Sequence, residues 1–556
     1  MSLESGPQAS SHGVPDAGDQ AHLGRSAVVM AVGTTLSRLT GLARLVALAY
    51  ALGVAESRLA DSYNIANTMP NVIYELILGG VLSSVFIPVV VQELRTRSPE
   101  EAWDSVSVLA SVSMVVLVGL SVASVVAAPA VIRLFTLRLS GPEAARQQEV
   151  ATFFLRVFAP QIAFYGAAAI AGALLNAYDR FAVPMFAPVL NNVVVIGTCL
   201  AFASIVKGTP TDASVGANLG ERLLLAGGTT AGVAAMALAH WPFVRRLPGR
   251  LRLRVDFGHP AVRKLAGLSA WTLGYVVVNQ IGFGIALYLA NGVQGGPTAF
   301  FTAFAFFQLP YGVVAVSIMT ALVPTLAARH VDGDVEGFRS WVAGGLRATT
   351  LLLLPATAAY LVLSRPLIQT LLQHGVTSSA SVPLVSSVLD MFSIGLVPFS
   401  AFLLFLRAFY ARQDARTPLV VNVVSNVAYV AFALLLFPRA QVRGLALAHS
   451  LSYLVAAIAA GAVLARRIGG LEATHTLREL AKAVGATLVA TGAMVSVRVG
   501  LGATMAPGGT RALVEVALAG AAGLVAFVAS ARALGTEDLS LVTGLLPSRL
   551  RRRPAS

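Results

Sequence analysis

The chain has 556 residues, of which 56% are hydrophobic and 12% are charged, and its formal net charge is +14. Its mean hydropathy of +0.75 excludes a soluble globular protein of this length. Apolar runs recur along nearly the whole chain, and many reach the ~20 residues that a helix needs to cross a bilayer. Because these runs are continuous rather than alternating, they predict helices and not the strands of a barrel.

The hydropathy pattern predicts an all-α integral membrane protein with about fourteen membrane-spanning helices. In chain order, the predicted spans are 26–54, 63–93, 103–135, 150–176, 184–206, 222–245, 262–290, 298–328, 340–372, 383–410, 418–437, 442–465, 478–501 and 510–533.

Polar segments divide these spans into two lobes of six helices each and a final pair of helices. Residues 1–24 are rich in Ser, Gly and Pro and predict a disordered cytoplasmic tail. The remaining units are an N-lobe in 25–247, a cytoplasmic linker in 248–261, a C-lobe in 262–468, helices 13 and 14 in 469–535, and a basic cytoplasmic tail in 536–556.

An internal repeat supports two lobes with the same helix order. The segment LNAYDRFAVPMFAPVLNNVVVI starts at Leu175, and FYARQDARTPLVVNVVSNVAYV starts at Phe409. Aligning Pro184 with Pro418 also aligns Asn192 with Asn426. Duplicated helical lobes around a central cavity are typical of transporters, in which one lobe rocks against the other.

Basic residues cluster in the loops that follow even-numbered spans, as in the run from Arg245 to Arg254. The positive-inside rule places these loops, and with them both termini, in the cytoplasm. We interpret the clusters as topology signals and contacts with membrane lipids, and not as a nucleic-acid interface.

Two arginines, Arg38 and Arg44, lie inside the first predicted span. A charge at membrane depth costs from a few kcal/mol upward, so it needs a partner. The six-residue spacing separates the two side chains by about 120° around a helix. They predict a cationic cradle for a phosphate or pyrophosphate. Alternatively, one of them reaches the membrane surface or pairs with Asp61 or Glu75. Arg156 is a third candidate for binding the substrate, unless it lies at the interface.

Several other polar residues are candidates for the same cavity. Asn279, Gln280 and Gln308 interrupt apolar spans and are expected to line a cavity or to form hydrogen bonds between helices. Asp61 opens the second span, either as an N-cap or as an ion-coupling site. Asp414 is a candidate for ion coupling or, alternatively, a turn residue with local ion pairs.

Catalytic and metal-binding motifs are absent from the sequence: it contains no HExxH, P-loop or GxSxG pattern. We therefore expect neither an enzyme nor a bound metal. Apart from the substrate, the only small ligand that we expect is a monovalent cation, either sodium or a proton.

Six motifs in order resemble the MurJ/MviN family of lipid II flippases, which belongs to the multidrug/oligosaccharidyl-lipid/polysaccharide exporter superfamily. They are LSRLTGLAR, LADSYNIANTMPN, LGGVLSSVFIPV, LNAYDRFAVPMFAPVLNN, FQLPYGVVAVSIMTALVPTLA and FYARQDARTP, within residues 26–535. The resemblance implies fourteen helices, two lobes and a solvated cationic cavity. It also implies export of the undecaprenyl-pyrophosphate-linked peptidoglycan precursor across the bacterial cytoplasmic membrane, and cell-wall synthesis proteins as further partners.

The resemblance assigns substrate contacts to Arg38 and Arg44 and ion dependence to Asp61. The chain departs from the family pattern where better-known members carry further cavity charges: it has Tyr74, followed by Glu75, as well as Ala305 and Gln308. We therefore expect a less charged cavity. A flippase for another polyprenyl-linked polysaccharide, a cation-coupled drug exporter and a transport-incompetent scaffold for cell-wall enzymes remain alternatives.

Overall fold

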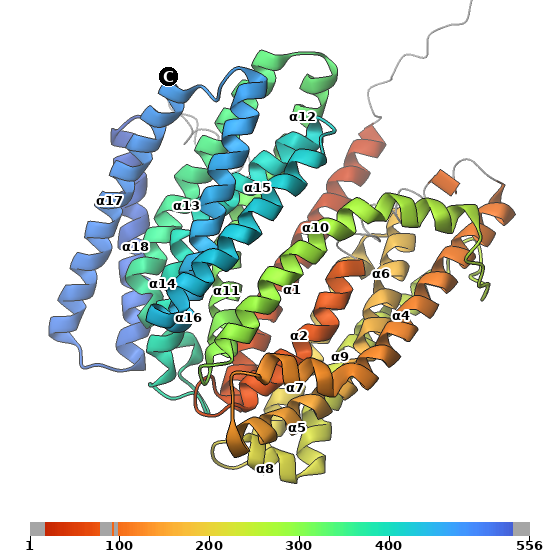
Figure 1. Cartoon of the computed structure of the whole chain (residues 1–556). Coiled ribbons are helices and arrows are strands. Elements are labelled where there is room, and N and C mark those ends of the chain that lie inside the picture. The colour runs from red at the N-terminus through yellow and green to blue at the C-terminus, as the bar shows by residue number, and fades with distance from the viewer. Residues whose placement is uncertain (1–16, 78–91, 94–97, 537–556) are drawn as a thin grey trace, which may run out of the picture.

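The computed structural model describes residues 17–77, 92–93 and 98–536, and within them the chain is almost entirely helical. Figure 1 shows one bundle drawn in orange and yellow and a second in green to blue, with α1 and α10 running between them. The predicted tail in 1–24 is described only from Ala17, where α1 already begins. Of the tail in 536–556, only Thr536 is described, and the motif in 78–89 lies entirely outside the described residues.

The first bundle contains the elements before residue 245. They are α1 (Ala17–Leu52), α2 (Leu59–Ile77), α4 (Pro99–Thr136), α5 (Gly141–Phe158), α6 (Gln161–Ala177), α7 (Ala182–Ile205), α8 (Asp212–Ala217) and α9 (Leu219–Val244). Local sequence explains several starts and breaks. Pro99 stands at the first turn of α4 after the N-cap Ser98, and Pro160 separates α5 from α6.

The second bundle follows a polar linker. Its elements are α10 (Pro260–Ala290), α11 (Gly296–Pro310), the π-helix η2 (Tyr311–Ala315), α12 (Val316–Val331), α13 (Val335–Leu372), α14 (Ser381–Ile394), α15 (Leu396–Ala411) and α16 (Arg416–Ile468). The π-turn directly follows Pro310, which lacks a donor for the helical ladder. Within α16, Gln441 has a φ of 49°, so this element is two helices that meet at a kink.

The last two helices, α17 (Ala473–Thr504) and α18 (Gly509–Ala533), pack against each other and against α13. Ala483, Ala486 and Phe527 are buried there together with Leu351 of α13.

The predicted multi-pass helical fold is confirmed. Among the described residues, nine helices are long and apolar enough to cross a membrane, and the pair α14–α15, bent by 46°, makes a tenth. When the two halves of α16 are taken separately, every predicted span coincides with one helix or with a run of successive helices, as for α5–α6, α11–α12 and α14–α15. The second span is described only as far as Ile77.

Helix α10 belongs to both bundles. Its first turns bury Ala261 and Leu265 in a cluster with Trp103 and Leu174 of the first bundle. Its last turns bury Ala286 and Leu289, together with residues of α11 and α14, in the core of the second. The two lobes therefore share one long helix.

Candidate functional site

The two lobes are joined at one end of the molecule, which we call the sealed end. It consists of the α1–α2 loop (53–58), the α10–α11 loop with the start of α11 (291–298), and the α13–α14 loop with the start of α14 (373–381). Backbone groups contribute to the seal: the N–H of Val376 donates to the carbonyl of Tyr50 at 3.0 Å, and the Thr377 hydroxyl donates to the carbonyl of Ala49 at 2.7 Å.

Asp61 lies in the sealed end and is completely buried. Its carboxylate accepts hydrogen bonds from the N–H of Gly295 at 2.7 Å and from the N–H and hydroxyl of Thr298 at 3.1 and 2.7 Å. The donors stand at the N-terminus of α11, where a negative charge is favoured. Asp61 therefore links α2 of the first lobe to α11 of the second, and it caps the partner helix rather than its own.

Glu56 makes a second charged link across the sealed end. It accepts hydrogen bonds from the N–H of Val54 at 2.7 Å, from the N–H of Ser378 at 2.7 Å and from the hydroxyl of Ser381 at 2.8 Å. Burial by itself raises the pKa of this carboxyl, but the hydrogen bonds from Ser378, Ser381 and Val54 together outweigh it and lower the pKa below its ordinary value. Glu56 therefore makes its contacts across the sealed end as an ionised carboxylate.

Arg58 completes the seal. It donates to Glu143 at 2.5 Å and to the carbonyl of Asn291 at 3.1 Å. Asn291, which is fully buried, exchanges hydrogen bonds with Gln147 of α5. These contacts again join the first lobe to the α10–α11 loop.

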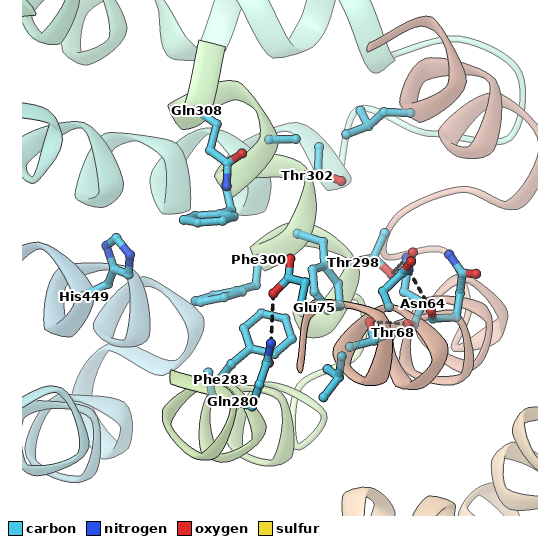
Figure 2. Close-up of a pocket in the computed structure, with 18 of the residues that line it drawn as sticks. Asn64, Thr68, Glu75, Gln280, Phe283, Thr298, Phe300, Thr302, Gln308 and His449 are labelled. Atoms are coloured by element: carbon cyan, nitrogen blue, oxygen red, sulfur yellow. Dashed lines mark hydrogen bonds between the residues drawn. The ribbon is translucent and has the colours of Figure 1, made fainter. Parts of the chain in front are cut away.

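A cavity of about 720 Å³ extends from the sealed end into the space between the lobes. Amides and hydroxyls dominate its polar lining, which includes Asn64, Asn67, Thr68, Asn71, Asn192, Asn279, Gln280, Thr298, Thr302, Gln308, Ser425 and Asn426. Figure 2 shows Gln308 above this space and Gln280 below it, with Asn64, Thr68 and Thr298 at its right. Amide-rich helix faces in a membrane protein point toward protein or water, which fits a hydrated cavity.

Arg44 is the one arginine among the described residues that line the cavity, and Glu75 is the one carboxylate. Glu75 accepts a hydrogen bond from Gln280 at 2.8 Å, which joins α2 to α10 across the cavity (Figure 2). No ion pair between Arg44 and an acid is present among the described residues. The guanidinium of Arg44 therefore remains available for an anion that enters.

The second lobe supplies an aromatic wall. Phe304, Phe399, Tyr429 and Tyr453 line the cavity, and the ring of each lies 4.7 to 6.5 Å from the ring of His449. This side offers apolar and polarisable surface opposite the polar side chains of α2.

Other predicted residues lie outside the cavity lining. Arg38 is half-buried on α1, with its guanidinium against Gly312 in η2 of the other lobe. Arg156 is exposed on α5 and does not line the cavity. The predicted ion-coupling residue Asp414 lies in the α15–α16 turn, where Thr417 and Arg467 donate to it. Burial acts to raise its pKa, but these donors lower the pKa to about 2.

Two residues that depart from the family pattern, Tyr74 and Ala305, add no charge to the cavity. Tyr74 packs against Tyr165, with ring centroids 4.5 Å apart, and Ala305 lines the cavity without adding charge. Sequence reasoning did not single out Glu56 or Arg58 as part of a seal. A charged Glu-Ser-Arg loop carries no spacing signal, and its partners in the second lobe, Asn291, Ser378 and Ser381, are more than 200 residues away.

The family model described as "Lipid II flippase MurJ" matches residues 48–509. The chain belongs to the lipid II flippase MurJ family.

Two relatives illustrate the relationship. A "Probable lipid II flippase MurJ" of Rhizobium meliloti is 30% identical over 75% of this chain and 76% of its own length. The "Lipid II flippase MurJ" of Burkholderia cenocepacia is 28% identical over 71% of this chain and 76% of its own length.

Solved structures share the fold. The structure titled "Lipid II flippase MurJ, inward closed conformation" superposes with a TM-score of 0.72 at 19% identity, covering 91% of this chain and 99% of its own. An inward-facing multidrug transporter of the MATE family gives a TM-score of 0.64 at 16% identity, and the match covers 81% of this chain and 99% of the transporter. These likenesses support the two-lobed helical fold.

Proposed function

We propose that this chain translocates lipid II, the polyprenyl-pyrophosphate-linked peptidoglycan precursor, across the bacterial cytoplasmic membrane by alternating access. Family membership supports the class of transporter. The observation that carries the site is Arg44, an arginine without an ion-pair partner among the described residues, in a cavity whose other polar lining residues are mostly uncharged amides and hydroxyls. A guanidinium binds phosphate oxygens through two parallel hydrogen bonds, which suits a pyrophosphate.

The topology of this proposal places both termini and the basic loops in the cytoplasm. The sealed end then faces the outside, and the described state receives substrate from the cytoplasmic side. Asn279, Gln280 and Gln308 would bind the sugar and peptide parts of the substrate through hydrogen bonds, with Arg38 at the approach to the cavity.

A gradient of a monovalent cation, sodium or a proton, or the membrane potential would drive the return of the lobes. In the described state the carboxylate of Asp61 is occupied by donors from Gly295 and Thr298. We propose that Asp61 becomes free for a cation only when the sealed end opens. Asp414 is a weaker candidate, because Thr417 and Arg467 already satisfy it.

Depletion with complementation tests the proposal. In cells deprived of their own lipid II flippase, wild-type chain should restore export of lipid II to the outer leaflet, and Arg44→Ala should reduce export about tenfold. Arg156→Ala, an exposed arginine outside the cavity, is the matched control and should restore export fully. Failure of the wild type to restore export, with transport of a different lipid-linked glycan or of a cationic drug, would favour the alternative transporters.

A further inference from the structure

A second cavity, of about 350 Å³, lies where the α4–α5 turn of the first lobe meets α10 and α16 of the second. It shares no lining residue with the central cavity. Its walls are Arg138, Leu289, Gly292, Val293, Leu434, Phe437, Pro438 and Gln441. All of them except Arg138 belong to the second lobe, so the cavity exists only while the two lobes are together here.

Arg138 is held in place by aromatic rings. Its guanidinium carbon lies 5.1 Å from the ring centre of Phe437 and 5.9 Å from that of Tyr288. The side chain also passes close to Gly292, where a β-carbon would stand 3.0 Å from Nε. Among the described residues, no carboxylate pairs with Arg138. The rings orient the charge without neutralising it.

More positive charge surrounds the kink of α16. Arg439 and Arg443 flank the lining residue Gln441 in sequence, and both are exposed. Arg439 donates only to the carbonyl of Leu435 in its own helix, at 3.3 Å. The positive-inside rule leaves few arginines on this side of the membrane, so a cluster here calls for an anionic partner.

The surface next to the cavity is apolar and faces outward. Leu434 and Leu435 are 58% and 59% exposed on α16, the turn before Pro438. An occupant that satisfies both features has a negative headgroup and a hydrocarbon tail. We propose that this cavity binds an anionic phospholipid of the adjacent leaflet, with its phosphate on Arg138 and an acyl chain along Leu434, and that the bound lipid holds the lobes together at the sealed end.

Lipid titration of the purified full-length chain tests this inference without any transport substrate. Phosphatidylglycerol should raise the thermal unfolding midpoint in a saturable way, and phosphatidylcholine should not. R138Q should weaken the apparent affinity for phosphatidylglycerol about tenfold. The control R133Q, an exposed arginine in the last turn of α4 that does not line the cavity, should leave the affinity unchanged. Equal affinity in R138Q and wild type, or equal effects of the two lipids, would overturn the proposal.

A distance measurement tests the bridging role. Labels on S140C in the α4–α5 turn and L435C on α16 report the separation of the lobes. In the wild-type background, phosphatidylglycerol should narrow the distribution of label-to-label distances and shift it to shorter values. In R138Q it should leave the distribution unchanged. If inorganic phosphate alone gives the same narrowing, the acyl chain is unnecessary and a lipid is not the ligand.

Discussion

The guanidinium of Arg38 lies against Gly312, so close that a β-carbon at position 312 would overlap it. Arg38 comes from α1 of the first lobe and Gly312 from η2 of the second, so this contact joins the lobes away from the sealed end. The absence of a side chain at 312 gives Arg38 its place beside the cavity.

Gly312→Ala should therefore shift the Arg38 guanidinium and reduce transport, by less than Arg38→Ala does, because the long side chain can move aside. Since both changes act on the same contact, the double variant should be no worse than Arg38→Ala alone. Transport assays on the three variants measure this. Gly284→Ala is the control, because nothing lies within 4 Å of a β-carbon there. Additive losses in the double variant would show that Gly312 acts independently of Arg38.

Glu75 opposes the binding of an anion, because it is the one carboxylate among the described cavity residues and Arg44 lines the same space. Glu75→Gln should tighten the binding of a pyrophosphate-linked lipid severalfold, and the tighter complex should slow its release. Equilibrium binding and single-turnover export separate these two effects. Weaker binding by this variant would mean that Glu75 orients the substrate through Gln280.

Asp61→Ala leaves the donors of Gly295 and Thr298 without an acceptor in a fully buried place. We expect a loss of about 2 kcal/mol or more in the stability of the sealed end. Asp61→Asn keeps one acceptor oxygen, so its sealed end should be less stable than in the wild type and more stable than in Asp61→Ala. Distance distributions across the α2–α11 contact report the change. Asp414→Ala, in a turn outside the seal, should leave this distance unaltered.

Acid should weaken the sealed end through Glu56. Its pKa is lowered in the folded chain because the hydrogen bonds from Ser378, Ser381 and Val54 outweigh burial. A depressed pKa means that the stabilisation is complete above the ordinary value of 4.5 and is lost as the pH falls through the lower folded value. The same lobe-to-lobe distance, followed between about pH 6 and 3, checks this. In Glu56→Gln the part of the pH response due to Glu56 should vanish.

The spans and the repeat were predictable because their signals are local. Apolar runs give the helices, and the aligned Asn192 and Asn426 have matching roles in the two lobes. Asn192 donates to Thr40 of α1 at 3.0 Å, and Asn426 donates to Asn279 of α10 at 3.0 Å. Each asparagine ties a helix of its lobe to the first helix of that lobe.

The seal was not predictable in the same way. Asp61 suggested an N-cap, but it caps α11, more than 200 residues away, and much of the seal uses backbone groups that every residue has. Arg38 and Arg156 could not be placed either, because a single sequence gives the spacing of charges on a helix but not the direction that the helix faces.

Helix α10 packs its first turns with Trp103 and its last turns with the core of the second lobe. A chain cut in the polar linker before His259 would therefore leave the first fragment without Ala261 and Leu265, which cover its own apolar surface. A cut near Gly274 would instead leave each half of α10 with the lobe against which it packs. The boundary between the two packed lobes therefore differs from their boundary in sequence, because the first half of α10 packs with the lobe that precedes it.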